Sequence, residues 1–420
     1  MTATITEPTT TTEPALADLK VTATGAEWLR KLSAVGVAIS SRPAVPILSF
    51  MVIECNRGKA TLVGYDYSTT ASARLNHEPV NALRNTKALI PFHWLVRTIR
   101  VLTNRKRDVP VTVESKDLLG RRLTTVTAAG YTIPFLHSVG LSEYPTIPSH
   151  GVLDAFDLDR EDLAGALNRA TVSASRDDTL PILTSIKLDC SGKKLTIHAT
   201  DRYRLSAETL KLPRTVQEFS FLLQAASWKA MSKHLVAEKI TVGVLAAADI
   251  ANRIGGCETL NIGSGDVAFT LSPIGGDYPK IDSLFEAEYG QTLDVNRRDL
   301  LDQVLVAREL NERNIPALVR IGPGSVSVSP SYHEGAEQAA TPALLADTVN
   351  ITEPATVAYN PHYLLDAINA IKTEAVRFSF FKLTKPVCIA PVNEKGKKQG
   401  TYRHLLMPVR LPGDVLNGGE

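Results

Sequence analysis

The residues best suited to chemistry lie in one short segment, where a carboxylate stands among basic side chains. Asp201 is followed by Arg202 and Arg204. A carboxylate can act as a general base or hold a metal ion, and arginine binds phosphate, so the segment permits a metal-dependent enzyme acting on nucleic acid. An Asp beside Arg at the end of a strand is more often a structural ion pair. Asp66 ends an equivalent strand-like run, which favours the structural role.

No other pattern joins a nucleophile, a base and an orienting group. The histidines have no HExxH spacing, and no glycine-containing turn matches the phosphate loop GxxxxGK[ST]. The cysteines form no CxxC pair and no cluster with histidine, which fits a reducing cytoplasm; they are Cys55, Cys190, Cys257 and Cys388. We therefore predict no catalytic residue, no metal and no cofactor. The enzyme centred on Asp201 is the least favoured alternative.

A proline-containing segment recurs along the chain at a constant spacing. Its three copies are Arg42–Leu48, Arg176–Leu183 and Arg313–Leu318. Their central prolines, Pro46, Pro181 and Pro316, are each 135 residues apart, and Asp66 and Asp201 are separated by the same 135 residues. This period is too long for a solenoid repeat and fits a whole small domain. The 420 residues are therefore predicted to form three copies of one folding unit.

Each copy is predicted to contain two amphipathic helices. In the first one, Trp28 and Leu32 recur at a helical period, and Lys31 lies off their stripe. Thr24 and Glu27 have the spacing of a capping box. The other opening helices are Asp159–Ser173 and Arg297–Leu310, and the second helices are Phe92–Leu102, Trp228–Leu235 and Tyr363–Ile371. One repeated position in the second helices is assigned to the aromatic residues Trp94, Trp228 and Tyr363.

Short strands fill the rest of each copy, so the fold class is α+β, with two helices packed on antiparallel sheet in every domain. The domains are predicted at 18–149, 150–288 and 289–413, with disordered tails at 1–17 and 414–420. The predicted strands are Ile47–Glu54, Lys59–Tyr65, Val109–Ser115, Arg122–Ala128, Lys193–His198, Gln217–Leu223, Lys239–Leu245, Val267–Ser272, Ala317–Ile321, Ser325–Ser329, Thr356–Tyr359, Val376–Phe381, Val387–Ala390 and His404–Val409.

Composition and charge narrow the class of protein. With 44% hydrophobic and 21% charged residues, the chain has the composition of a globular protein that can bury several cores. No segment has the unbroken apolar run that a membrane helix needs. A net charge of +2 excludes a protein that is basic over its whole surface but allows one basic face.

Basic residues gather on one side of the predicted helices. Arg97 and Arg100 lie opposite the apolar stripe of Phe92–Leu102, a segment without any acidic residue. Lys229 and Lys233 occupy the matching places in the second copy. A single helix of this kind is usually a solvated face opposite a core. Because such helices recur at equivalent places, we predict one shared surface for an anionic partner.

Five segments carry a family resemblance: Arg42–Leu48, Ala199–Leu205, Asp277–Lys280, Tyr359–Asp366 and Leu406–Leu411. Together they resemble the bacterial sliding clamps, the beta subunits of DNA polymerase III, and actinobacterial members in particular. The resemblance covers residues 18–413. It implies a head-to-tail homodimer that closes a ring of six domains, with the sheets outside and the helices lining the hole. It also implies a non-enzymatic processivity subunit.

In that family the hole surrounds duplex DNA, which is held through its phosphates without reading of the base sequence. The implied partners are double-stranded DNA, the catalytic subunit of DNA polymerase III, the clamp loader, and other polymerases and repair proteins that bind through short peptide motifs. No membrane partner is implied. By this resemblance the DNA-facing residues are Arg42, Arg97, Arg100, Arg176, Lys229, Lys233 and Arg308.

The family binds those peptides, which carry Gln and paired apolar residues, in a pocket between its second and third domains. The matching positions are Leu183, Thr200, Arg202, Tyr203, Arg204, Leu205, Pro279, Leu284, Met407, Pro408, Val409, Arg410 and Leu411. Two features depart from the family pattern. Ser283 stands where many members carry a basic residue, and Arg202-Tyr203 replaces a small residue followed by His. A specialised or phage-encoded clamp paralogue with altered partner or inhibitor binding is therefore an alternative.

Overall fold

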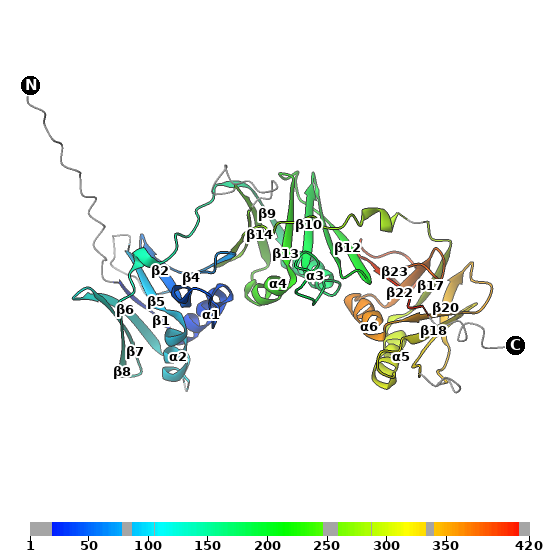
Figure 1. The fold of residues 1–420 in the computed structure, drawn as a ribbon, viewed down its shortest axis with the longest axis horizontal. Coiled ribbons are helices and arrows are strands. Elements are labelled where there is room, and N and C mark those ends of the chain that lie inside the picture. Colours follow the sequence, from blue (N-terminus) through cyan, green and yellow to red (C-terminus); the bar gives the residue numbers. More distant parts are fainter. Residues whose placement is uncertain are drawn as a thin grey trace, which may run out of the picture.

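The chain folds into three similar units (Figure 1), and within the described residues each unit contains eight strands and two α-helices. The computed structural model describes residues 19–77, 86–104, 106–246, 259–286, 288–332 and 340–410. In every unit the order is strand, helix, four strands, helix, three strands. The predicted threefold repeat and the α+β class are therefore confirmed. The predicted tails at 1–17 and 414–420 lie outside the described residues.

The bounds of the elements follow the repeat. The first unit contains β1 (Leu19–Thr24), α1 (Gly25–Val35), β2 (Phe50–Asn56), β3 (Lys59–Tyr65), β4 (Thr69–Leu75), β5 (Thr86–Pro91), α2 (Phe92–Leu102), β6 (Pro110–Leu118), β7 (Arg121–Ala128) and β8 (Tyr131–His137). The second contains β9 (Val152–Asp159), α3 (Arg160–Thr171), β10 (Ser185–Ser191), β11 (Lys194–Thr200), β12 (Arg204–Lys211), β13 (Phe219–Gln224), α4 (Ala225–Met231), β14 (Lys239–Leu245), β15 (Thr259–Ser264) and β16 (Val267–Leu271). The third contains β17 (Gln291–Asn296), α5 (Arg297–Leu310), β18 (Ala317–Gly322), β19 (Ser325–Ser329), β20 (Leu344–Val349), β21 (Ala355–Tyr359), α6 (Pro361–Ala370), β22 (Ala375–Phe380), β23 (Val387–Val392) and β24 (Arg403–Leu406).

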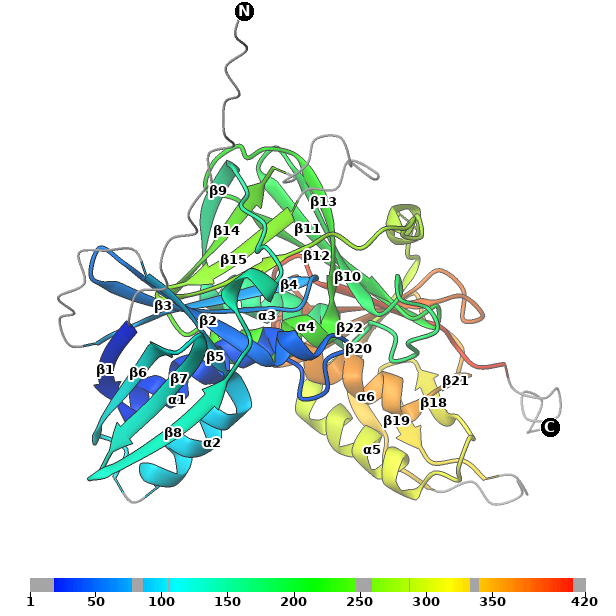
Figure 2. The same ribbon diagram turned by 60° about the vertical axis from the view of Figure 1, so that its left-hand side comes forward.

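The three units form an arch with the helices on its inner side (Figure 1). Figure 2, turned by 60°, shows α3 and α4 beneath the strands of the second unit, whereas β6 to β8 and β18 to β21 lie beside the helices of the outer units. Each helix buries its apolar stripe against the sheets and leaves its other face to the hollow of the arch. The predicted placement of sheets on one side and helices on the other is therefore confirmed.

The sheets continue from one unit into the next. Strand β4 pairs with β16 over five residues, from Thr69 opposite Leu271 to Ala73 opposite Val267, and β12 pairs with β24 in the same way. The fourth strand of one unit thus joins the eighth strand of the following unit, which creates an eight-stranded and a 12-stranded sheet. Strand β8 is the exception. It ends a four-stranded sheet and has no fourth-strand partner among the described residues.

Helix α1 shows how the sequence fixes a helix start. Thr24 caps it, because the Thr24 hydroxyl accepts the backbone N–H of Glu27 at 3.2 Å. The predicted capping box is only half formed, since the Glu27 carboxylate accepts from Arg30 and from the backbone N–H of Asn76 instead. Trp28 is fully buried on the stripe that was expected.

The expectation that Lys31 lies away from the buried stripe is wrong. Its side chain is only 1% exposed, and its Nζ lies 3.4 Å from the carboxylate of Asp266 and 3.8 Å from that of Glu27. Asp266 belongs to the turn between β15 and β16 of the second unit. The Lys31 ammonium group can be buried because Asp266 of the second unit supplies an opposite charge. The residue pattern of α1 alone does not reveal this contact between units.

The assignment of Trp94, Trp228 and Tyr363 to one repeated position is wrong by one residue. Trp94 and Tyr363 are the third residues of α2 and α6 and are half-buried. Trp228 is the fourth residue of α4 and fully buried. Its indole N–H donates to the side-chain oxygen of Asn168 at 2.9 Å, so the ring can fill the core without an unsatisfied donor.

Every predicted strand has a counterpart in the structure, and two have bounds that differ for a physical reason. Ile47 belongs to a 3-10 turn that begins at Pro46, so β2 starts at Phe50. The last predicted strand was expected to reach Val409 but ends at Leu406. Pro408 has no N–H to continue the ladder.

The described cysteines, Cys55, Cys190 and Cys388, are buried and free. Burial raises the pKa of all three thiols, which keeps them protonated. Cys257 lies outside the described residues. Among the helices of the described residues, none is long and apolar enough to cross a membrane.

Candidate functional site

The cations that the sequence predicts to face DNA belong to the helices on the inner side of the arch and to the segments that follow those helices. Arg97 and Arg100 lie on α2, Lys229 lies on α4, and Lys233 follows it in a short turn. All four are exposed, as are Arg42 and Arg176 in the loops that follow α1 and α3. Arg308 differs, because it is half-buried on α5 and pairs with Glu309. The DNA contact of all seven remains a prediction.

The loop that contains Arg42 is fixed to helix α2. The backbone N–H of Arg42 donates to the hydroxyl of Ser40 at 3.1 Å, and the Ser40 carbonyl lies 3.0 Å from Nε2 of His93. His93 is the second residue of α2 and so precedes Arg97 by one turn. The loop cation and the helix cations are thereby held on the same side of the first unit.

Asp201 organises the tight turn between β11 and β12. Its Oδ1 accepts the backbone N–H groups of Tyr203 at 3.0 Å and Arg204 at 2.9 Å. These bonds hold Arg202 in the left-handed region with a φ of 78°. With its oxygens committed to the turn and to the Arg204 side chain, the Asp201 carboxylate has a structural role.

The first unit repeats this turn without the arginines. Asp66 accepts the backbone N–H groups of Ser68 at 2.9 Å and Thr69 at 2.7 Å, and Tyr67 has a φ of 72°. The shared geometry confirms the structural interpretation of the two aspartates. No group of three or more potential metal ligands occurs among the residues that the structure describes.

Arg204 ties the second unit to helix α6 of the third. Its guanidinium donates to Oδ2 of Asp201 at 2.9 Å and to Oδ2 of Asp366 at 2.7 Å, and it lies 4.2 Å from the ring centroid of Tyr363. The residue is only 4% exposed. Two carboxylates and an aromatic face therefore satisfy one buried cation. Burial and the nearby Asp201 carboxylate raise the pKa of Tyr363, so its hydroxyl stays neutral.

Exposed apolar side chains lie around the contact between Arg204 and Asp366. Tyr203 is 57% exposed, Met407 45% and Val409 40%, and the backbone N–H of Met407 donates to the carbonyl of Tyr203 at 3.0 Å. Leu284 is 54% exposed on a 3-10 turn whose Phe285 packs in a small buried cluster with Leu205 and Leu405. Apolar side chains of this size, exposed in one region, indicate a binding surface.

The residues predicted for the peptide pocket divide into a buried floor and an exposed wall. The buried ones are Leu183, Thr200, Arg204 and Leu205. The exposed or half-buried ones are Arg202, Tyr203, Pro279, Leu284, Met407, Pro408, Val409 and Arg410. Leu411 lies outside the described residues. The buried residues support the turn between β11 and β12, and the exposed residues are the ones that a bound ligand would contact.

A cavity of about 680 Å³ opens between the second and third units at this place. From the second unit it is lined by Arg176, Arg202 and Tyr203, and from the third by Arg308 and Tyr363. The rings of Tyr203 and Tyr363 have centroids 6.3 Å apart. Of the described residues expected to contact peptides, only Arg202, Tyr203 and Arg204 line this cavity, together with Arg176 and Arg308, which were expected to face DNA. The other expected peptide residues that the structure describes are not part of its lining.

Sequence reasoning missed Asn360, Tyr363 and Asp366 as site residues. All three line the cavity, and Asn360 also caps α6 by accepting the backbone N–H of His362 at 2.9 Å. The sequence did contain a signal for the start of α6, because Asn-Pro before an apolar stripe marks the beginning of a helix. This signal places Tyr363 in the first turn of α6. Their contact with the β11–β12 turn, 162 positions away for Arg204 and Asp366, was not visible.

Comparisons with known proteins agree with this geometry. The family model of the DNA polymerase III beta subunit, central domain, matches residues 157–280, and that of the C-terminal domain matches residues 287–410. The Beta sliding clamp of Micrococcus luteus is 30% identical over 249 residues, which is 59% of this chain and 74% of the relative. That of Streptomyces coelicolor is 27% identical, with 90% and 95% covered. The Beta sliding clamp homolog GriR of Streptomyces muensis is also 27% identical, with 93% and 98% covered.

Solved structures show the same fold. The beta sliding clamp of C. crescentus has a TM-score of 0.80 at 18% identity and covers 94% of this chain and 100% of its own. A sliding clamp from Pseudomonas aeruginosa bound to griselimycin has a TM-score of 0.79 at 17% identity, with 94% and 100% covered. Three repeated units, inward helices and matched sequence thus lead to one conclusion: the chain belongs to the family of bacterial DNA polymerase III beta subunits, the beta sliding clamps.

Proposed function

We propose that this chain is a DNA sliding clamp, which encircles duplex DNA as a homodimeric ring and tethers the replicative polymerase and other proteins to it. The observation that carries the proposal is the arch itself, which has the helices α1 to α6 of the described residues on its inner side. Two of these helices, α2 and α4, carry the exposed cations Arg97, Arg100 and Lys229. Such a wall holds phosphates without base contacts. Retention then follows from enclosure, and the contacts stay weak enough for sliding.

The strand order supports closure by a second copy. Within the chain, β4 pairs with β16 and β12 with β24, so a fourth strand meets an eighth strand at both seams. Two strands lack this pairing among the described residues: β20, the fourth strand of the third unit, and β8, the eighth strand of the first. We propose that β8 of a second chain joins the third unit at β20, and that two such junctions close six units. Because β20 also pairs with β17 over residues 346–349 and with β19 over residues 344–345, this junction differs in detail from the seam between β4 and β16. It also removes the exposed edge of β8.

Ring closure is tested by charge placed on β8. Tyr131 and Leu136 are exposed on this strand. We expect Tyr131→Glu with Leu136→Glu to shift the mass in light scattering from dimer to monomer, and to abolish retention on closed circular DNA. Retention of the unchanged chain should also vanish when the circle is linearised. Val236→Glu, at an exposed site of the second unit, is the control and should remain dimeric.

A monomer of the unchanged chain at micromolar concentration, together with no retention on circular DNA, contradicts the proposal. A dimer that survives the β8 charges contradicts only the proposed closure. The ring needs no catalytic residue, and the hydrogen bonds of Asp201 support a non-catalytic role. The buried free cysteines are consistent with the reducing cytoplasm.

Docking of partners is proposed at the cavity between the second and third units. Tyr203, Met407 and Val409 supply apolar surface, and a few polar groups are available to orient an extended peptide. The DNA polymerase III catalytic subunit, the clamp loader and repair proteins are the expected users of this surface. They would present the short motif with Gln and paired apolar residues.

A second candidate is a specialised clamp with altered partner or inhibitor preference. It is favoured by the Arg202-Tyr203 turn, where both side chains are exposed, and by a similarity to GriR that equals the similarity to the Streptomyces coelicolor clamp. A polymerase-tail peptide that fails to bind while loading on DNA stays intact would select this candidate. Ordinary peptide binding would eliminate it.

A further inference from the structure

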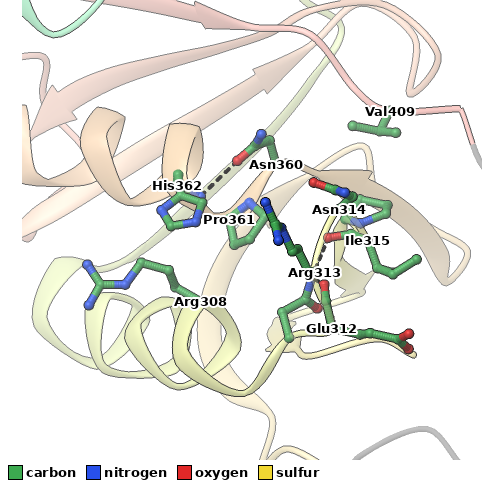
Figure 3. A pocket seen from close by; sticks show the side chains of 11 residues that line it. Arg308, Glu312, Arg313, Asn314, Ile315, Asn360, Pro361, His362 and Val409 are labelled. Carbon is green, nitrogen blue, oxygen red and sulfur yellow. Dashed lines mark hydrogen bonds between the residues drawn. The ribbon is translucent and has the colours of Figure 1, made fainter. Parts of the chain in front are cut away.

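A side cavity of about 420 Å³ opens next to the proposed peptide groove. Figure 3 shows that it lies between the end of α5, the loop that follows, and the start of α6. It shares Arg308, Asn360 and His362 with the larger cavity, and Val409 of the proposed groove also lines it. A peptide bound to the exposed apolar residues of the proposed groove would therefore also contact this cavity through Val409.

The loop in this cavity is the third copy of the repeated proline segment, and it presents an arginine. Arg42 and Arg176 begin the first two copies, and Arg313 begins the third. Figure 3 shows the Arg313 side chain among the other lining residues, below Asn360 and Pro361. Arg313 is exposed, and among the described residues no ion pair involves it. Its guanidinium is available to an incoming anion.

The other charges of the lining nearly cancel, so the attraction of this cavity for an anion depends on Arg313. Glu312 is the one acidic residue among the described residues that line the cavity, against Arg308 and Arg313, and Arg308 already pairs with Glu309. Helix α6 begins here and adds the partial positive charge of its first turn. The amide of Asn311 is used internally, since its Oδ1 accepts the backbone N–H of Ser331 at 2.7 Å. Arg313 is therefore the group left to bind a ligand.

We propose that this side cavity selects partner segments that carry an acidic residue next to their apolar anchors, with Arg313 pairing with the carboxylate. The proposal rests on the proposed peptide groove. A DNA phosphate is the other anion to consider, but the lining also contains Ile315, Pro316 and Val409. The stem of a peptide side chain covers such apolar atoms, and a phosphate does not.

Four labelled ten-residue peptides provide the test. One pair carries Gln and a Leu-Phe anchor with two aspartates before them or, as its match, two asparagines. The other pair has the same residues after the anchor. We expect one acidic peptide to bind about threefold to fivefold more tightly than its asparagine match at low salt, the scale of a solvent-accessible ion pair. High salt should shrink this preference.

Arg313→Gln should remove the preference and leave the asparagine peptides unchanged, and Arg313→Lys should keep part of it. Arg121→Gln, the same charge change at an exposed site in the first unit, is the control. Equal binding of acidic and neutral peptides, or a preference that survives Arg313→Gln, overturns the proposal. Weaker DNA binding by Arg313→Gln with an unchanged peptide preference would assign the residue to DNA instead. Failure of every peptide to bind would count against the groove itself.

Discussion

At the scale of single residues, Asp201 and Arg204, which first suggested catalysis, stabilise the fold. The Asp201 carboxylate accepts two backbone N–H groups and the side chain of Arg204, and Asp66 repeats the backbone part of this pattern. The sequence was sufficient to favour this structural role, because the two aspartates have equivalent positions. It was not sufficient to show Asp366 as the second partner of Arg204, because that contact joins two units.

Arg204 should be the most sensitive polar residue of the proposed peptide site. Arg204→Met leaves the carboxylates of Asp201 and Asp366 facing each other without a counter-charge, which should lower the free energy of unfolding by about 2–3 kcal/mol. Urea unfolding measures this change. Arg214→Met, which removes the exposed ion pair with Asp154, is the matched control and should unfold near the urea concentration of the unchanged chain. Equal losses of stability in the two variants would contradict the assigned role.

At the scale of elements, the sequence predicted those whose apolar partners are local. Helices α2 and α5 form with the expected bounds, and so do β3, β14 and β19. The fourth strands, β4 and β12, were missed. Strand β4, Thr69–Leu75, buries mainly threonine and alanine, and its outer partner is β16 of the next unit. Lys31 was misjudged for the same reason, because Asp266 is contributed by that unit.

The seam between β12 and β24 buries a titratable group, His404, which is 0% exposed and hydrogen-bonds the hydroxyl of Tyr402 at 3.1 Å. Burial and the charge of Arg204 lower the pKa of His404 to about 3. Because the folded pKa lies below the ordinary value near 6.5, the unfolded chain binds more protons below pH 6.5. Stability is therefore lost as the pH falls from 6.5 towards 3.

We expect the free energy of unfolding to fall by about 2 kcal/mol between pH 7 and pH 5 through His404 alone. Urea unfolding at both pH values measures the fall. His404→Gln should flatten this dependence, whatever its stability at pH 7. His362→Gln, at an exposed position on α6, is the control and should retain the dependence. The same fall in the His404→Gln variant would show that other groups cause it.

At the scale of the whole molecule, the sequence predicted a basic inner surface from a chain of nearly balanced charge. The DNA-facing role of these cations stays a prediction, and α2 shows the pattern behind it, because the exposed Arg97 and Arg100 alternate with the buried Leu95 and Ile99. A pocket between the second and third units was expected only from the family resemblance, and the full lining of the two cavities was not predicted. Their walls combine a turn, two helices and the last residues of the described chain, which only the packing of two units brings together.

The inner cations should set the salt dependence of DNA binding. Replacing Arg97, Arg100, Lys229 and Lys233 by Gln should weaken binding at low salt. It should also reduce the slope of log affinity against log salt by about 0.9 for every phosphate that the variant no longer neutralises. Filter binding over a salt series measures both. The control replaces Lys59, Lys194, Lys395 and Lys397, exposed lysines on strands and turns. A similar change in slope for the control set would mean that DNA does not bind preferentially to the cations of the inner helices.

The ladders that run through both seams of the arch have a mechanical consequence. Backbone hydrogen bonds do not depend on side-chain identity, so substitutions along β4, β12, β16 and β24 leave the joints intact while the sequence diverges. Separating two units of one chain requires breaking such a ladder, and the covalent chain still connects the units. At the proposed junction between chains, only noncovalent contacts hold the two sides together. For the proposed ring, we therefore expect opening at a junction between chains, with each chain moving as one stiff half.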